Sequence, residues 1–190
     1  MIRTTLLAAL LGTTAIAGHA GAATYSIDPT HTFVMYELGH FATSTNRGRF
    51  AVPAGTVQFD RQGKTGKVEL TINTTDFDTG VDALNKYLAS EEFFNSAEFP
   101  TGKFVADKFS FNGDKVTEVS GQLTLLGKTQ PVTLKATHFN CYQNSMLKRE
   151  VCGGDFETHV VRSQFGINWG LNFGFADSVR LLVQVEAIKQ

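Results

Sequence analysis

Apolar residues at every second position are the feature that most constrains the fold of this chain. In segment 67–74, Val68, Leu70 and Ile72 alternate with polar residues. Successive side chains of a β-strand point to opposite faces of a sheet, so this period predicts a strand with one buried face. The same pattern recurs in 32–38, 119–125, 132–136 and 179–185. Weaker versions of it predict further strands at 46–52, 55–60, 102–111 and 155–167.

Glycine- and proline-containing turns separate these segments, and one segment departs from the period of two. The stretch 125–131 joins two well-patterned strands and predicts a β-hairpin. Leu84, Tyr87 and Leu88 have the spacing of an apolar helical stripe, with Asp82 as a candidate N-cap. A second short helical turn is expected at 90–94. The segment 82–95 is equally compatible with a plug at one end of the sheet and with a lid over a binding site.

The number and spacing of the strands predict an all-β fold. Eight or nine short strands, joined mostly by short turns and interrupted by one short helix, favour a closed barrel or a sandwich. A barrel of this size has an interior that either side chains or one small ligand can fill. Without its first 23 residues the chain of 190 residues fits one domain, 24–190.

The first residues have the pattern of a secretory signal peptide. Arg3 is followed by an apolar run over 4–17 and by small residues up to Ala23. That run is shorter than the roughly 20 residues that span a bilayer. We therefore expect export, with cleavage near Ala22–Ala23 and residues 1–23 as the signal peptide. No later segment is apolar enough to span a membrane, so we do not expect an integral membrane protein.

Charge and cysteine content narrow the function classes. The chain has 17 Lys and Arg against 18 Asp and Glu, a net charge of −1. This balance lacks the basic footprint of a nucleic-acid-binding protein. Cys141 and Cys152 predict a structural disulfide in an exported chain, worth about 3 kcal/mol of stability. A redox-active pair is the alternative, but the spacing does not resemble a Cys-x-x-Cys motif.

No motif in the sequence indicates catalysis. The chain has no nucleophile elbow, phosphate-binding loop or zinc-protease helix motif, so we expect no catalytic residues and no enzyme. His31 and His40 are nine residues apart, which places them on opposite faces of one uninterrupted strand. No metal site is therefore predicted.

The inward face of the strand predicted at 32–38 can also be interpreted as part of a small-molecule site. Tyr36 shares the register of Val34 and Leu38, and His40 continues that register. Apolar pockets with a few fixed polar groups are typical of small-molecule sites. The 16 Phe residues fit either a rich core or a large apolar cavity. From these residues alone a solid core is favoured.

Several motifs, in order, resemble the YceI-like family of lipocalin-like, polyisoprenoid-binding proteins. The resemblance runs from about Thr24 to Lys189. Its most specific block is 121–134, with Gly-Gln-Leu-Thr-Leu at 121–125 and Pro-Val-Thr-Leu at 131–134. The other matching residues are Tyr25, Ser26, Ile27, Asp28, His31, Ser44, Gly48, Phe50, Phe93, Phe94, Asn95, Arg162, Phe165, Gly166 and Ile167.

The resemblance implies a periplasmic, eight-stranded antiparallel lipocalin-like barrel with a short helical insertion. Its interior would hold a polyisoprenoid or a similar long-chain amphiphile. The implied ligand-binding residues are Val34, Tyr36, Leu38, His40, Phe50, Phe59, Leu70, Ile72, Leu84, Leu88, Phe165 and Ile167.

The expected function is the non-catalytic binding, transport or storage of this lipid. The alternative is an isoprenoid quinone, bound by a component of a periplasmic electron-transfer or stress-response system. No cofactor is expected beyond such a bound polyisoprenoid or quinone, and a homodimer stays open. In the helical segment, relatives often carry charged residues where this chain has Leu84, Asn85, Tyr87 and Ala89. This departure predicts a less charged ligand head group.

Overall fold

The expected β architecture is confirmed by the computed structural model, which describes residues 21–190. The predicted signal peptide lies outside the described residues except at its last three positions. In chain order the elements are β1 (Ala23–Ile27), β2 (Phe33–His40), β3 (Ser44–Ala51), β4 (Ala54–Asp60), β5 (Thr65–Asn73), β6 (Phe77–Asp78), α1 (Asp82–Leu88), β7 (Thr101–Asn112), β8 (Lys115–Leu125), β9 (Lys128–Asn144), β10 (Arg149–Val161), the 3-10 helices η1 (Arg162–Phe165) and η2 (Leu171–Phe173), and β11 (Ser178–Lys189).

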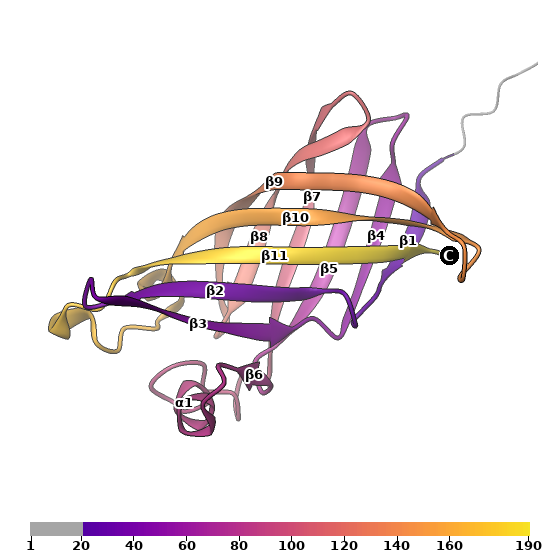
Figure 1. Ribbon diagram of the computed structural model, residues 1–190. Helices are drawn as coiled ribbons and strands as arrows, with labels where there is room; N and C mark the ends of the chain where they lie inside the picture. Colours follow the sequence, from indigo (N-terminus) through magenta and orange to yellow (C-terminus); the bar gives the residue numbers. More distant parts are fainter. Residues whose placement is uncertain (1–20) are drawn as a thin grey trace, which may run out of the picture.

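Eight antiparallel strands close into a barrel (Figure 1). The ring runs β1-β4-β5-β7-β8-β9-β10-β11 and returns to β1. Strand β11 also pairs with β2 beyond its pairing with β1, and β2 continues the sheet into β3 and β6. The short helix α1 lies next to β6, outside the ring. The predicted eight-stranded barrel with a helical insertion is therefore confirmed.

The alternation in the sequence separates the inside of the barrel from its surface. On β5 the side chains of Val68, Leu70 and Ile72 are buried. Between them Glu69 points outward and pairs with Lys103 of β7 at 2.6 Å. Burying an aliphatic side chain stabilises the fold by about 1.5–3 kcal/mol, whereas an exposed ion pair contributes about 0–1 kcal/mol. The inward residues therefore fix the register of the strands.

The hairpin predicted at 125–131 is confirmed as the β8–β9 connection. Leu125 pairs with Lys128, which leaves Leu126 and Gly127 as a two-residue turn. Both residues have positive φ, 48° and 69°, as a type I′ turn requires. Glycine adopts this conformation without steric cost, so Gly127 favours the tight turn.

The helix forms where its stripe predicts, but its capping differs. Asp82 is the first helical residue and not the N-cap, a position that Val81 occupies without a side-chain cap. Asn85 accepts hydrogen bonds from the backbone and hydroxyl of Thr79, which hold the chain entering the helix. The second helical turn expected at 90–94 is wrong. That segment forms turns, closed by bonds such as the Asn95 amide to the Ser90 carbonyl.

Both bounds predicted for the strand at 155–167 are wrong. Strand β10 begins at Arg149 and stops at Val161, after which η1 bends the chain. The Arg162 guanidinium binds the carbonyls of Ile167 and Trp169, and Asp177 binds the amide and hydroxyl of Ser163. These bonds fold 162–177 into a compact loop, which a local pattern does not reveal.

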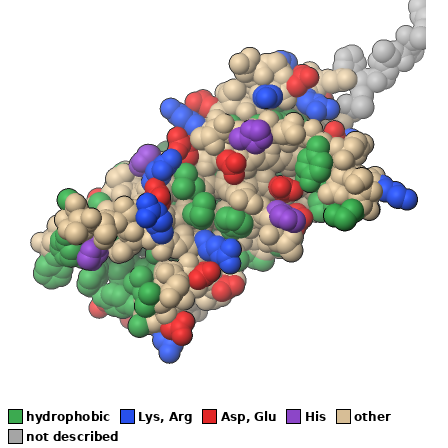
Figure 2. Space-filling model, in the orientation of Figure 1, with side chains coloured by type: hydrophobic (Ala, Val, Ile, Leu, Met, Phe, Trp, Pro, Cys, Tyr) green, Lys and Arg blue, Asp and Glu red, His purple; other side chains and the backbone are tan. Residues whose placement is uncertain are grey.

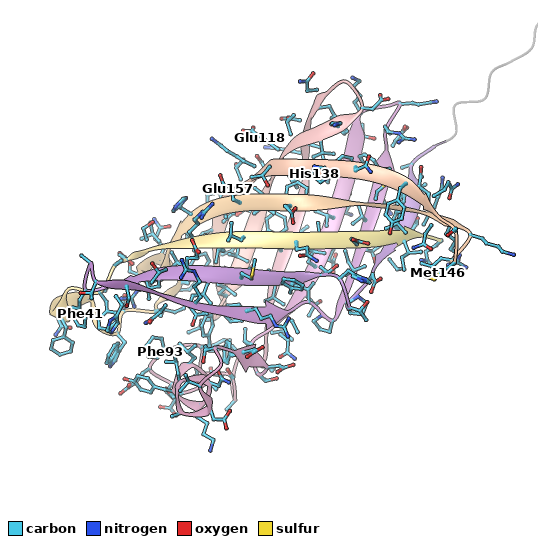
Figure 3. All side chains as sticks on the ribbon, viewed as in Figure 1. Phe41, Phe93, Glu118, His138, Met146 and Glu157 are labelled. Atoms are coloured by element: carbon cyan, nitrogen blue, oxygen red, sulfur yellow. A yellow bond between two sulfur atoms is a disulfide. The ribbon has the colours of Figure 1, made fainter. Side chains whose placement is uncertain are left out.

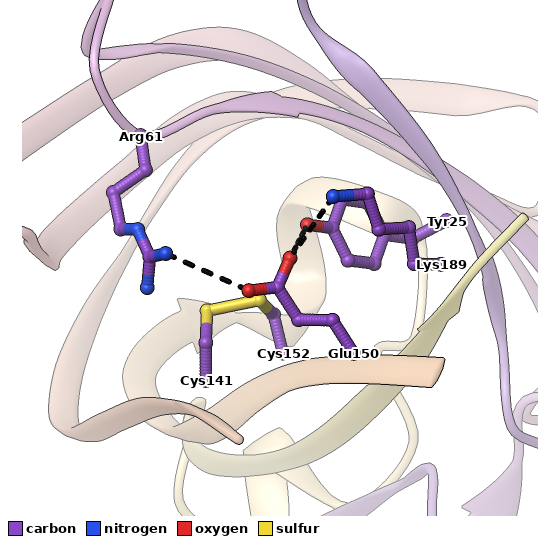
Figure 4. Close-up of a disulfide and its surroundings, with 6 residues drawn as sticks. All are labelled: Tyr25, Arg61, Cys141, Glu150, Cys152 and Lys189. Atoms are coloured by element: carbon purple, nitrogen blue, oxygen red, sulfur yellow. Dashed lines mark hydrogen bonds and ion pairs between the residues drawn. A yellow bond between two sulfur atoms is a disulfide. The ribbon is translucent and has the colours of Figure 1, made fainter. Parts of the chain in front are cut away.

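The predicted disulfide joins Cys141 of β9 to Cys152 of β10, directly opposite each other (Figure 4). Next to it, Glu150 accepts a hydrogen bond of 2.6 Å from the Tyr25 hydroxyl. Lys189 and Arg61 lie 3.4 Å and 3.5 Å from the same carboxylate. The disulfide and this cluster tie together five parts of the barrel at this end, namely β1, the β4–β5 turn, β9, β10 and β11.

Candidate functional site

The barrel contains an apolar chamber at the end that carries η1 and the segment 82–96. Its empty volume is about 1080 Å³, counted out to its mouth. Nine residues that the sequence suggested line it: Val34, Tyr36, Leu38, Phe50, Leu70, Ile72, Leu88, Phe165 and Ile167. The other lining residues are Thr74, Phe93, Phe94, Phe104, Leu123, Leu125, Val132, Leu134, Val160, Arg162, Val179, Leu181 and Val183.

A second apolar chamber lies toward the disulfide end, with an empty volume of about 640 Å³ when the open space at its mouth is included. The two chambers share four lining residues, namely Leu70, Phe104, Leu134 and Val183. On β11 the lining runs from Val179 to Ala187, about 26 Å along the strand at about 3.3 Å per residue. With a strand tilt of about 40° this corresponds to about 20 Å along the barrel axis. The two chambers together therefore have the length needed for an extended hydrocarbon chain.

Three of the suggested residues lie elsewhere. Phe59 lines the second chamber, where it packs against Tyr25 and Phe139. Leu84 is half-buried against the core and lines neither chamber. His40 also lines neither chamber, because β2 ends there and its ring packs on Phe41 and Phe175. Leu38 is therefore the last residue of β2 that lines the first chamber.

The sequence-based set of ligand-binding residues omits several residues that line the first chamber. Most of them could have been predicted from the alternation or from the family motifs. Leu123, Leu134 and Val183 occupy inward positions of patterned strands, so the period of two could have added them. Phe93 and Phe94 belong to a motif of the resemblance. Arg162 also belongs to such a motif, but no pattern in the sequence indicates that its side chain enters an apolar barrel.

The segment 82–96 forms one wall of the first chamber. Leu88, Phe93 and Phe94 face the space inside, and Phe94 also packs on Phe50 and Phe77. Ser96 is buried and donates a short hydrogen bond to the carbonyl of Thr74. The helical insertion is therefore part of the site, held by apolar contacts and by polar bonds at its base.

Aromatic side chains surround the outer end of this wall. Trp169 packs against Tyr87, Phe93 and Phe175 with ring centroids 5.3–5.5 Å apart. Hydrophobic side chains gather on the surface at this end of the molecule (Figure 2). Phe41 is half exposed at the tip of the β2–β3 turn, where its side chain points away from the barrel (Figure 3).

Tyr36 is one of the polar groups that line the first chamber. Its side chain is buried, and this burial raises the pKa of the phenol. Its partner across the β2–β3 pairing is Gly48, and a Cβ atom there would lie 2.7 Å from the Tyr36 ring. The absence of a side chain at position 48 therefore gives the ring its place against β3.

Arg162 brings a charged group to the same chamber. It is 5% exposed and is the one charged residue among 21–190 that is buried. Its Nε donates to the carbonyl of Ala176, and its Nη1 donates to those of Ile167 and Trp169. Burial lowers the pKa of the guanidinium, an effect that nearby Asp177 opposes.

Within residues 21–190, no group of three or more His, Cys, Asp or Glu side chains is arranged to hold a metal ion. The helices of the same residues are all too short or too polar to cross a bilayer. The site is a long apolar enclosure whose lining residues include Tyr36 and Arg162.

The profile of the YceI-like domain matches residues 25–187, almost all of the described chain. The chain belongs to the YceI-like family. Among its relatives, Protein YceI from Salmonella newport is 35% identical over 187 residues, covering 97% of this chain and 95% of that protein.

Solved structures share the fold. The Campylobacter jejuni YceI protein superimposes with a TM-score of 0.69 at 20% identity, covering 80% of this chain and 90% of that one. A polyisoprenoid binding domain from Saccharophagus degradans gives a TM-score of 0.61 at 13% identity, covering 88% and 99%.

Proposed function

We propose that this chain binds a polyisoprenoid or a similar long-chain amphiphile and carries or stores it in the periplasm. The observation that carries the proposal is the pair of neighbouring apolar chambers, which share Leu70, Phe104, Leu134 and Val183 as lining residues. Support also comes from the polyisoprenoid binding domain that shares the fold. The periplasmic location rests on the signal-like residues 1–23.

Apolar contact supplies the binding free energy in this proposal. Each buried CH₂ group contributes about 0.8 kcal/mol, so a chain of ten carbons gains about 8 kcal/mol before the cost of ordering it. A chain that reaches both chambers contacts more of the wall than one held in the first chamber alone. Affinity should therefore rise with chain length until the second chamber is full.

Leu134→Phe tests this dependence, because Leu134 lines both chambers. The larger ring should narrow their junction, so we expect long prenyl chains to lose at least about tenfold in affinity. Short chains that fit the first chamber should lose less affinity than long chains, because they do not cross the junction. Displacement of a fluorescent fatty-acid probe by prenyl alcohols of increasing length measures both.

Thr133→Phe is the matched control, because Thr133 is exposed on the same strand. It adds a ring of the same size outside the barrel and should leave the length dependence unchanged. If the wild-type protein binds long and short chains equally, or binds neither, the proposed use of both chambers is wrong.

An isoprenoid quinone is the second candidate ligand. Tyr36 lines the first chamber, a phenol can donate a hydrogen bond, and a quinone carbonyl is an acceptor. The same apolar enclosure would hold its prenyl tail. A quinone absorbs in the near ultraviolet and can be reduced, so the spectrum of an organic extract distinguishes it from a prenyl phosphate or alcohol.

A further inference from the structure

The Arg162 guanidinium has unused hydrogen-bonding capacity inside the apolar barrel. A guanidinium offers five N–H donors. The Nε and Nη1 groups donate to the carbonyls of Ala176, Ile167 and Trp169. Nη2 is buried and has no hydrogen-bond partner within residues 21–190. Leaving a buried donor of a charged group unpaired is costly, so such a group is a candidate for a ligand contact.

The positive charge of Arg162 also lacks a direct partner. None of the ion pairs within the described part of the chain includes Arg162. The neighbouring carboxylate, Asp177, accepts hydrogen bonds from the amide and hydroxyl of Ser163, at 2.9 Å and 2.6 Å. The guanidinium thus belongs to a residue in the wall of an apolar chamber, and its charge is only partly compensated by Asp177.

The bonds to the loop carbonyls fix the direction of the guanidinium. The accepting carbonyls belong to residues that lie 5, 7 and 14 positions after Arg162 in the chain. Because Nε and Nη1 are held in this way, the planar group is preorganised and little side-chain entropy remains to be lost on binding. Arg162 lies in the wall of the first chamber but not of the second.

We propose that Arg162 is the head-group site of the barrel, where its Nη2 group binds an acceptor oxygen of the lipid, with an anionic phosphate or carboxylate preferred over a neutral oxygen. This inference rests on the proposed function and adds the direction in which the lipid lies in the barrel. The head lies beside η1, and the chain runs past Leu70 and Leu134 toward the disulfide end. The cation of this site is Arg162, the first residue of η1, directly after the end of β10.

Two lipids with the same chain test the head-group preference, namely geranylgeranyl phosphate and geranylgeraniol. A hydrogen bond to a charged group predicts that wild-type protein binds the phosphate about ten- to a hundredfold more tightly. Arg162→Met should remove this preference and leave the affinity for geranylgeraniol within about threefold. Arg149→Met is the control, because it makes the same change of net charge at an exposed position of β10. It should keep the preference.

A second measurement covers the case in which Arg162→Met fails to fold, since the side chain also holds the 162–177 loop. In wild-type protein labelled with ¹⁵N-arginine, the Nη resonance of Arg162 should shift more with geranylgeranyl phosphate than with geranylgeraniol. If the role of Arg162 is purely structural, its resonance should respond equally to both lipids. Wild-type protein should then bind both lipids with equal affinity.

The outcomes separate the two proposals. Equal affinity of wild-type protein for both lipids, with equal shifts at Arg162, would overturn the head-group assignment and leave chain binding intact. Failure of both lipids to bind would instead refute the proposed function.

Discussion

At the scale of single residues, Tyr36 and Gly48 show how one missing side chain shapes the site. They are paired across β2 and β3, and the Tyr36 ring occupies the space that a side chain at 48 would need. Thr79 Cγ2 and the Asp78 carbonyl also lie close to that position, at 2.9 Å and 3.1 Å. The wall of the chamber therefore depends on a glycine that contributes no contact of its own.

Gly48→Ala should push the Tyr36 ring toward the chamber and destabilise the protein by about 1–3 kcal/mol, as overpacking does. The displaced ring should also lower the affinity for a prenyl chain. Denaturant unfolding and probe displacement measure the two effects. Gly39→Ala on β2 is the control, because its Cβ would meet only Ala176 at 4.0 Å. Equal stability of the two variants would contradict the assigned role of Gly48.

Glu150 gives the fold a dependence on pH. The hydrogen bond from Tyr25, together with Lys189 and Arg61, lowers the pKa of its carboxyl group. The folded state therefore binds this proton more weakly than the unfolded state does. The resulting stabilisation is complete above the ordinary carboxyl pKa of about 4.3 and is lost as the pH falls through the lowered value.

Glu150→Gln should lower the free energy of unfolding by about 1 kcal/mol at neutral pH, and the difference from wild type should shrink toward about pH 3. Urea unfolding at several pH values measures it. Glu91→Gln, at an exposed site, should show no such trend. A difference that grows in acid would have the wrong sign for this account.

At the scale of elements, the agreement with the sequence depends on whether a segment is held by local or distant bonds. Strand β5, the β8–β9 hairpin and α1 follow their own periodicity and turn residues, so all three could be predicted. The end of β10 could not, because Arg162 binds carbonyls up to 14 residues away and bends the chain there. The turns after α1 likewise depend on Ser96 and its contact with Thr74.

The β9–β10 hairpin carries the disulfide, and its removal should weaken the fold without changing it. Cys141→Ala with Cys152→Ala should cost about 3 kcal/mol in the chain-entropy description of a loop of this length. Guanidinium unfolding should show a lower midpoint with a nearly unchanged slope. Reductant should destabilise wild type by a similar amount and leave the double variant unaffected. An unchanged midpoint would show that the hairpin needs no cross-link.

At the scale of the whole molecule, the same period of two that predicts the barrel leaves its interior undecided. Val34, Leu70 and Leu134 would face inward in a solid core and in a hollow barrel alike. Whether they meet at the centre depends on the circumference of the ring and on the packing of the 82–96 segment, which are properties of the closed fold. The cavity is therefore a structural finding, and so is the position of Arg162 in its wall.

The ligand itself provides the most direct test of the account. Protein exported by a bacterial host should be examined by native mass spectrometry, with organic extraction of the same sample. We expect an added mass that matches one long-chain isoprenoid lipid per chain and the recovery of that lipid in the extract. A barrel that stays free of lipid, even after incubation with long-chain isoprenoids, would contradict the central claim.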